Sequence, residues 1–275
     1  IQTRQEGTKV IYTAHGFHFF NGASFFNWAT FFVFEKILGY YTDCLITINN
    51  EDYTNAKKFK MSRKIECISG IGVDLIKFKK QTNEIKQNLR FSYGFNNDDF
   101  ILISVAELSK NKNQKMLIRV MDELKRSHKN IILLLVGDGK YHNNYLKQIK
   151  KCNLEHNAKI LGYRKDIPEL LLLSDVFLTA SQREGLPLSV MEAMATGLPV
   201  IATDCRGNRD LVKDNVNGFL VKINDVSSFA KSIEKLYYDR QLSNRFGYSS
   251  SELIKQYDIS NVSNKMRIIY KNIIN

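Results

Sequence analysis

The chain has 275 residues, which is enough to bury the core of one large domain or two modest ones. Its four cysteines show no C-x-x-C pairing, which argues against a disulfide framework or a zinc site and favours a reducing, cytoplasmic location. No apolar run approaches the ~20 residues that a transmembrane helix needs.

The net charge of +12 comes from 40 Lys and Arg against 28 Asp and Glu, and the excess lies almost entirely after residue 75. Such an excess attracts nucleic acid, anionic lipid or a diphosphate substrate, and solvated helix faces explain it equally well. Because no helix-turn-helix, RNP-like or zinc pattern accompanies the charge, we expect no nucleic-acid partner. The chain opens on Ile1 instead of Met, shortly before its first strand, so we expect an N-terminal truncation.

Short apolar runs alternate with amphipathic stretches, which predicts an α/β fold with parallel sheets wound by helices. The expected strands are residues 10–13, 45–48, 65–69, 100–105, 131–136, 159–161, 176–179, 199–202 and 219–221. The expected helices include residues 114–126, 141–151, 167–174, 187–195 and 226–237, with two long helices over residues 241–274. Two α/β units meet near residues 70–80, where a Gly-Ile-Gly-Val-Asp sequence precedes the polar run 77–88.

Two features stand out before residue 45. His15 directly follows the first expected strand, and residues 17–41 are unusually rich in Phe, Trp and Tyr. A core helix would explain the aromatic stretch. The alternative is an interfacial helix whose aromatic side lies at the headgroup boundary of a membrane.

The segment 184–192 reads Glu-Gly-Leu-Pro-Leu-Ser-Val-Met-Glu and places two carboxylates around an expected helix start. Pro187 suits the first helical turn, and Gly197 with Pro199 marks the helix end. The helix start offers unpaired N–H groups and a partial positive charge, so the backbone around Gly185, Leu186, Pro187 and Leu188 would then hold a diphosphate. Glu184 and Glu192 can each accept several hydroxyl hydrogen bonds, so one carboxylate can meet a sugar and the other a ribose.

This segment, followed by small residues and a Pro-Val-Ile-Ala strand, resembles the E-x7-E motif of the retaining GT-B glycosyltransferases of family 4. The sequence His15-Gly16-Phe17-His18-Phe19 and the stretches 35–36, 41–43, 46–49 and 51–53 resemble the exopolysaccharide and capsule branch of that family. The resemblance implies two Rossmann-like domains with parallel sheets that face each other across a cleft, the N-terminal one incomplete. Residues 1–75 would form the acceptor-binding domain and 76–258 the nucleotide-sugar domain, with 259–275 as a helix that crosses back to the first.

The resemblance also implies the roles of single residues. His15 would face the transferred sugar, and Lys112 would neutralise the negative charge that grows on the leaving diphosphate. Glu107 stands where the family has Arg, so we assign it no phosphate contact. Tyr163 or Arg164 would flank a uracil ring, although an ordinary strand-to-helix turn explains these two residues almost as well.

The function implied is transfer of a hexose or N-acetylhexosamine, with retention, from a UDP-sugar to a lipid-linked saccharide acceptor in cell-surface polysaccharide biosynthesis. We expect no metal or other cofactor, with the nucleotide sugar as donor substrate, and a cytoplasmic protein peripheral to the inner face of the plasma membrane. Two alternatives are a sugar-nucleotide 2-epimerase of the same fold and a donor-binding module without activity. The E-x7-E pattern together with Lys112 argues against the epimerase.

Overall fold

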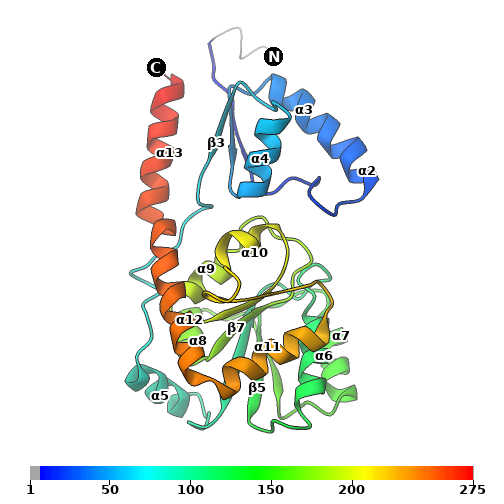
Figure 1. The fold of residues 1–275 in the computed structure, drawn as a ribbon, viewed down its shortest axis with the longest axis vertical. Helices are drawn as coiled ribbons and strands as arrows, with labels where there is room; N and C mark the ends of the chain where they lie inside the picture. The colour runs from blue at the N-terminus through cyan, green and yellow to red at the C-terminus, as the bar shows by residue number, and fades with distance from the viewer. Residues whose placement is uncertain (1–6, 275) are drawn as a thin grey trace. The chain divides into compact units, whose positions relative to one another are not determined.

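The computed structural model describes residues 7–274, which form two compact units that we describe separately (Figure 1). The N-terminal unit comprises the chain up to Val73, the segment Glu184–Leu188 and the residues from Gln256 onward. The C-terminal unit comprises Asp74–Arg183 and Ser189–Lys255. Residues 1–6, on which the expectation of a truncated start depends, lie outside the described residues.

The N-terminal unit is built on a three-stranded parallel sheet in the order β1-β2-β3. Its strands are β1 (Ile11–Ala14), β2 (Cys44–Thr47) and β3 (Lys64–Cys67). Its helical segments are α2 (Phe25–Asn27), the π-helix η1 (Trp28–Phe32), α3 (Val33–Tyr40), α4 (Asn50–Lys58) and α13 (Ile259–Ile274). Side chains alternate along β2: Ile46 packs with the α13 residues on one face, and Leu45 joins the aromatic cluster on the other.

The C-terminal unit contains a six-stranded, wholly parallel sheet in the order β6-β5-β4-β7-β8-β9. Its strands are β4 (Phe100–Val105), β5 (Ile131–Val136), β6 (Ala158–Gly162), β7 (Val176–Thr179), β8 (Val200–Thr203) and β9 (Gly218–Val221). The chain winds outward from β4 in one direction and then from β7 in the other. The sheet therefore has a topological switch point between β4 and β7, the place where open α/β sheets bind ligands.

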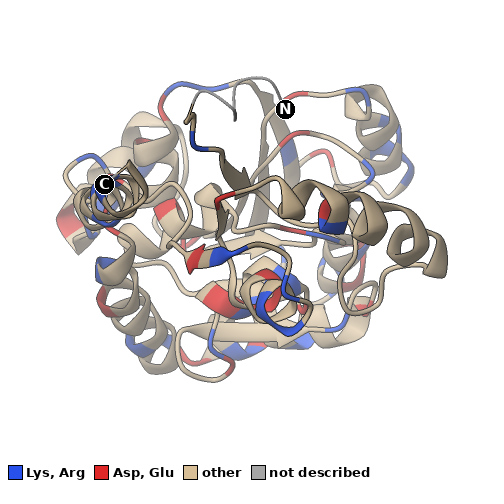
Figure 2. Ribbon diagram, turned by 90° about the horizontal axis from the view of Figure 1, so that it is seen from above, with Lys and Arg blue, Asp and Glu red and all other residues tan. Residues whose placement is uncertain are grey.

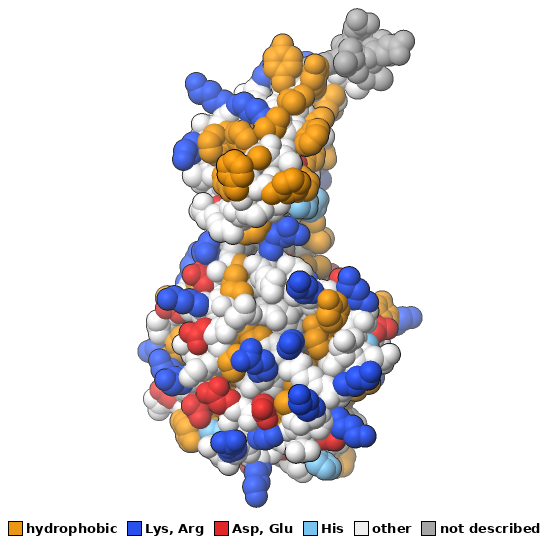
Figure 3. Space-filling view, turned by 90° about the vertical axis from the view of Figure 1, so that its right-hand side faces the viewer, with side chains coloured by type: hydrophobic (Ala, Val, Ile, Leu, Met, Phe, Trp, Pro, Cys, Tyr) orange, Lys and Arg blue, Asp and Glu red, His pale blue; other side chains and the backbone are white. Residues whose placement is uncertain are grey.

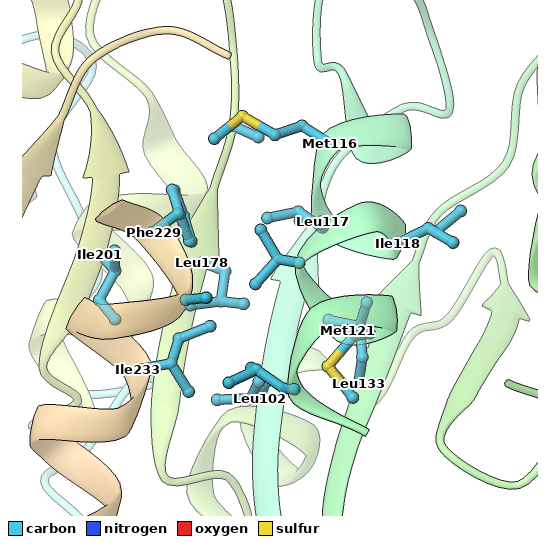
Figure 4. Close-up of a cluster of buried hydrophobic side chains, with 14 of the residues drawn as sticks. Leu102, Met116, Leu117, Ile118, Met121, Leu133, Leu178, Ile201, Phe229 and Ile233 are labelled. Carbon is cyan, nitrogen blue, oxygen red and sulfur yellow. The ribbon is translucent and has the colours of Figure 1, made fainter. Parts of the chain in front are cut away.

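Helices cover the sheet of the C-terminal unit. They are α5 (Asn83–Ser92), α6 (Gln114–Leu124), α7 (His142–Lys151), α8 (Ile167–Leu172), α9 (Leu188–Ala195), α10 (Arg206–Leu211), α11 (Val226–Tyr238) and α12 (Arg240–Leu253), and the 3₁₀ turn η2 (Ile254–Tyr257) follows α12. Figure 4 shows Leu117 of α6 and Ile233 of α11 over Leu102 and Leu178 of the central strands, in one buried cluster. This cluster removes one face of the sheet from water and stabilises the unit.

The α/β class with parallel sheets is confirmed, and every expected strand is present within two residues of its predicted bounds. The polar run 77–88 is not a linker throughout, because α5 begins inside it at Asn83. The Thr82 hydroxyl accepts a hydrogen bond from the Ile85 N–H at 3.3 Å and so caps that helix. Helix α9 begins at Leu188, so Pro187 immediately precedes it instead of occupying its first turn.

The aromatic stretch 17–41 divides between the core and the surface. Phe19 packs against Trp28 and Phe32 with ring centroids 5.2 and 5.4 Å apart, while Phe25 and Phe34 are 87% and 65% exposed. Figure 3 shows hydrophobic side chains gathered on the face of the N-terminal unit that carries α2 and α3. A core helix therefore accounts for only part of the stretch, and the rest is an exposed apolar surface.

Candidate functional site

The loops after β4 and β7 meet at the switch point of the C-terminal sheet. The side-chain amide of Asn111 donates to the carbonyl of Arg183 at 3.0 Å, and the Gln182 N–H donates to the Asn111 carbonyl at 2.8 Å. The side-chain amide of Asn113 donates to the Ala180 carbonyl at 3.3 Å from a left-handed backbone with φ of 54°. The β4–α6 loop therefore holds the chain that leads into Glu184.

Sequence reasoning missed the roles of Asn111 and Asn113. The available signal was an Asn-rich turn directly after a buried strand, because Asn tolerates the left-handed region better than most residues. Lys112 lies between these two asparagines and is half-buried, with its N–H 3.4 Å from the Ser109 hydroxyl. Glu107, at the usual Arg position, is exposed.

The Gly-Asp-Gly turn after β5 packs directly on the loop after β4. Gly137 and Gly139 have φ of 133° and 156°, and a Cβ on either would overlap the backbone of Ala106 or Leu108. The Leu108 N–H donates to the Asp138 carbonyl at 2.9 Å. Both glycines are therefore required by a close backbone approach.

The segment 184–188 belongs to the N-terminal unit. Glu184 is 8% exposed, and Leu186 packs on the cluster that contains Ile48. A Cβ at Gly185 would overlap the carbonyl oxygen of His15. The structure thus brings His15 against Gly185, and only glycine permits that approach.

His15 itself is exposed and lines a cavity of about 680 Å³ within the N-terminal unit. The walls of this cavity include Thr13 of β1, Ile48 after β2, and Arg267 and Lys271 of α13. An imidazole and two cations at an otherwise largely apolar cavity can meet an anionic group that is attached to an apolar one.

Glu192 is the one acidic side chain of α9, a helix whose Val190, Met191, Ala193 and Met194 are buried. Burial raises the pKa of the Glu192 carboxyl from 4.5 to about 7, and the nearby Lys77 opposes the shift. Glu192 therefore changes charge near neutral pH.

Tyr163 and Arg164 behave differently although they are neighbours. The Tyr163 ring is 78% exposed and available for stacking. The Arg164 guanidinium donates to both Asp166 oxygens, at 2.8 and 2.5 Å, and the Tyr93 hydroxyl donates to Asp166 at 2.6 Å. The Arg164 hydrogen bonds hold the pKa of Asp166 at about 2, so Arg164 is engaged in local structure.

Lys and Arg are distributed among Asp and Glu over the helices and loops (Figure 2). Within residues 7–274, no group of three or more His, Cys, Asp or Glu side chains is placed to hold a metal ion. None of the helices in this part of the chain is both long enough and apolar enough to span a bilayer.

A doubly wound parallel sheet with loops joined at its switch point is the arrangement of nucleotide-binding α/β domains. The chain belongs to the family described as glycosyl transferases group 1, which matches residues 85–253. Members of this family are transferases, so the expectation of a glycosyltransferase is confirmed at that level.

Two curated relatives match nearly the whole chain. EpsD of Bacillus subtilis, whose assigned name is that of a glycosyltransferase, is 42% identical over 270 residues, 98% of this chain and 71% of the relative. The UDP-Gal:alpha-D-GlcNAc-diphosphoundecaprenol alpha-1,3-galactosyltransferase of Escherichia coli is 29% identical over 268 residues, 95% of this chain and 68% of the relative.

Two solved structures share the fold. HepE from Anabaena, in complex with UDP, superimposes with a TM-score of 0.85 at 22% identity and covers 98% of this chain and 74% of its own. Sucrose-phosphate synthase from Thermosynechococcus elongatus gives 0.84 at 20% identity, with 99% and 70% covered. The fold is GT-B, as expected from the E-x7-E motif.

Proposed function

We propose that the chain is a retaining glycosyltransferase of family 4 that moves a hexose or N-acetylhexosamine from a UDP-sugar to a lipid-linked saccharide. One observation carries the proposal. The chain leaving β7 at the switch point leads through Glu184 into the start of α9, and Glu192 lies on that helix with its pKa raised to about 7. The UDP complex of HepE, which has the same fold, is consistent with this donor class.

In this proposal the diphosphate binds the amide groups of Gly185, Leu186 and Leu188 at the start of α9. Pro187 has no N–H and donates no hydrogen bond to the diphosphate, but the partial positive charge of the helix start remains. Lys112 supplies a compact positive charge to the leaving phosphate. The exposed Tyr163 ring stacks on the uracil base.

The two acidic residues take separate parts of the donor. Glu192 accepts the ribose hydroxyls, and Glu184 accepts hydroxyls of the transferred sugar, with His15 as a further sugar contact. The acceptor oxygen forms its bond to the anomeric carbon while the bond from that carbon to the diphosphate breaks. The acceptor proton passes to the leaving phosphate on the same face of the sugar, so retention requires neither a carboxylate nucleophile nor a metal ion.

The acceptor proposal draws on two observations. The Escherichia coli relative is named for an undecaprenol-linked diphosphate acceptor, and the surface of α2 and α3 exposes Phe25, Phe26 and Phe34. Aromatic side chains of this kind insert at the interface of a bilayer. We assign the protein to the inner, cytoplasmic face of the plasma membrane, in the synthesis of an exopolysaccharide or capsule.

Vesicle sedimentation tests the membrane contact. Phe25→Ser with Phe34→Ser should reduce co-sedimentation with phosphatidylglycerol vesicles several-fold. Phe91→Ser is the matched control, because Phe91 is 88% exposed in the C-terminal unit and should leave vesicle binding unchanged. Equal binding by all three proteins would refute the assignment.

Turnover tests the proposed reaction. Labelled UDP-glucose, UDP-galactose and UDP-N-acetylglucosamine are incubated with the protein and a polyprenol-linked saccharide, in buffer with EDTA. The expected result is UDP release with an α-linked product. An epimerised donor sugar would favour the 2-epimerase, and intact UDP binding without release would favour the donor-binding module.

A further inference from the structure

A second cavity lies in the C-terminal unit, away from the loops of the candidate site. It has a volume of about 550 Å³, and its wall includes Asp175, Gly197 and Pro199. Asp175 directly precedes β7 and Pro199 directly precedes β8. The cavity is therefore at the N-terminal edge of the parallel sheet, whereas the loops after β4 and β7 leave its C-terminal edge.

Three cations in the wall of this cavity converge on one carboxylate. Lys86 Nζ is 2.8 Å from Asp175, and Arg90 and Arg240 guanidinium nitrogens lie 2.6 and 3.5 Å from it. A fourth cation, Lys80, also lines the cavity, with its Nζ 4.6 Å from the centre of the Tyr248 ring.

Asp175 alone cannot neutralise the four cations of the cavity wall. It is the one acid among the described residues that line the cavity, so the lining carries a net charge of about +3. Its two oxygens already accept from Lys86, Arg90, Arg240 and the Ile101 N–H. The partial negative charge at the end of α9, about half an elementary charge, offsets little of the excess.

The pKa of Lys86 is set first by burial and only then by its charged neighbours. Its pKa is lowered although it touches a carboxylate, because burial disfavours the ammonium and the neighbouring Arg90 and Arg240 repel it. A structural ion pair accounts for Arg90, which also donates to the Leu173 and Asn97 carbonyls at 3.0 and 2.9 Å. It does not account for Lys80. Nor does it account for Arg240, whose side chain is 54% exposed, lies over the Phe100 ring at 4.8 Å and reaches Asp175 only at 3.5 Å.

The remainder of the wall is polar and rich in hydrogen-bond donors, including Asn83, Gln87, Ser243 and Asn244. The volume is within the range of small-ligand pockets. A guanidinium group can donate two parallel hydrogen bonds to two oxygens of one phosphate. We propose that this cavity binds a small soluble phosphorylated anion of about diphosphate size, held by Arg240 and Lys80 with Lys86 behind them.

Calorimetric titration with inorganic pyrophosphate tests the proposal. The variant carries Lys80→Gln and Arg240→Gln, which leave Arg90 and Lys86 on Asp175. The control carries Arg126→Gln and Lys231→Gln, two exposed positions outside the cavity with the same loss of charge. The Lys80 and Arg240 variant should bind one equivalent of pyrophosphate with at least tenfold lower affinity. The control variant should change that affinity less than about twofold.

Pyrophosphate could also bind at the proposed diphosphate site, at the start of α9. Lys112→Gln affects only that site, so it distinguishes binding there from binding in the cavity. The proposal for the cavity is supported if the Lys80 and Arg240 variant no longer binds one equivalent of pyrophosphate while Lys112→Gln still binds it. This result does not depend on whether the proposed donor site is correct. The proposal is overturned if wild-type protein binds no pyrophosphate, or if only Lys112→Gln reduces binding. It is equally overturned if all variants bind alike. Should the double variant melt early, the single Lys80→Gln variant gives the same test.

Discussion

Replacement of Glu192 by Gln removes a titrating group that folding perturbs. The folded protein holds a proton on Glu192 up to about pH 7, whereas an unfolded chain releases it near 4.5. Between these values the folded state binds more protons, so the stability of the wild-type protein falls as the pH rises through this interval. Gln does not titrate, so the free energy of unfolding of the variant does not fall with pH for this reason.

The size of the effect follows from the two pKa values. Each pH unit between 4.5 and about 7 costs about 1.4 kcal/mol, so ionisation would cost at most about 3.4 kcal/mol. Glu192 keeps part of its surface in solvent and faces Lys77, and screening reduces the expected cost to about 1–2 kcal/mol.

Urea unfolding of both proteins between pH 4.5 and 8 measures this cost. The difference in free energy of unfolding should be small at pH 4.5 and should rise to about 1–2 kcal/mol in favour of Glu192→Gln above pH 7. A difference in free energy of unfolding that does not vary with pH would show that folding does not raise the pKa of Glu192. Although Glu192→Gln is the more stable protein, we expect it to bind UDP less tightly. A neutral amide binds the ribose hydroxyls less strongly than a carboxylate, so the affinity for UDP should fall about tenfold.

Three further changes test separate features. Glu184→Ala should reduce kcat at least tenfold while UDP affinity, measured by calorimetry, changes less than about twofold, because the proposed contact is to the transferred sugar. Gly185→Ala should lower the free energy of unfolding by about 1–3 kcal/mol through overlap with a neighbouring carbonyl, and more than Gly22→Ala, where a Cβ meets open space at a φ of 95°. Burial and, after it, the hydrogen bond to Asp166 raise the pKa of Tyr93 to about 12. Asp166→Asn should therefore lower this pKa only part of the way in an ultraviolet titration, because burial remains, and an unchanged value would argue against that hydrogen bond.

The strands of the C-terminal unit were predictable because their pattern depends on burial alone. Strands β4 and β5 match the prediction residue for residue, since both faces of a parallel sheet are covered and the strands are continuous apolar runs. Helix α5 was missed because its composition is polar. Its place is fixed by Arg90, which reaches Asp175, a tertiary contact that no local pattern reveals.

The candidate site was predictable in its local part. Segment 184–192 combines Gly, Pro and two Glu in a spacing that indicates a helix start, and the structure has α9 there. Contacts between distant residues were not predictable. The pairing of Asn111 with Arg183 and the approach of Gly185 to His15 join residues far apart in the chain, so sequence spacing carries no information about them.

A crystal structure of the protein soaked with UDP-glucose would show whether the segment 184–192 binds the nucleotide sugar. We expect diphosphate density on the amides of Gly185 and Leu188, the ribose hydroxyls on Glu192 and the glucose hydroxyls on Glu184. Density for the nucleotide sugar elsewhere, with both carboxylates turned away from the ligand, would contradict this expectation.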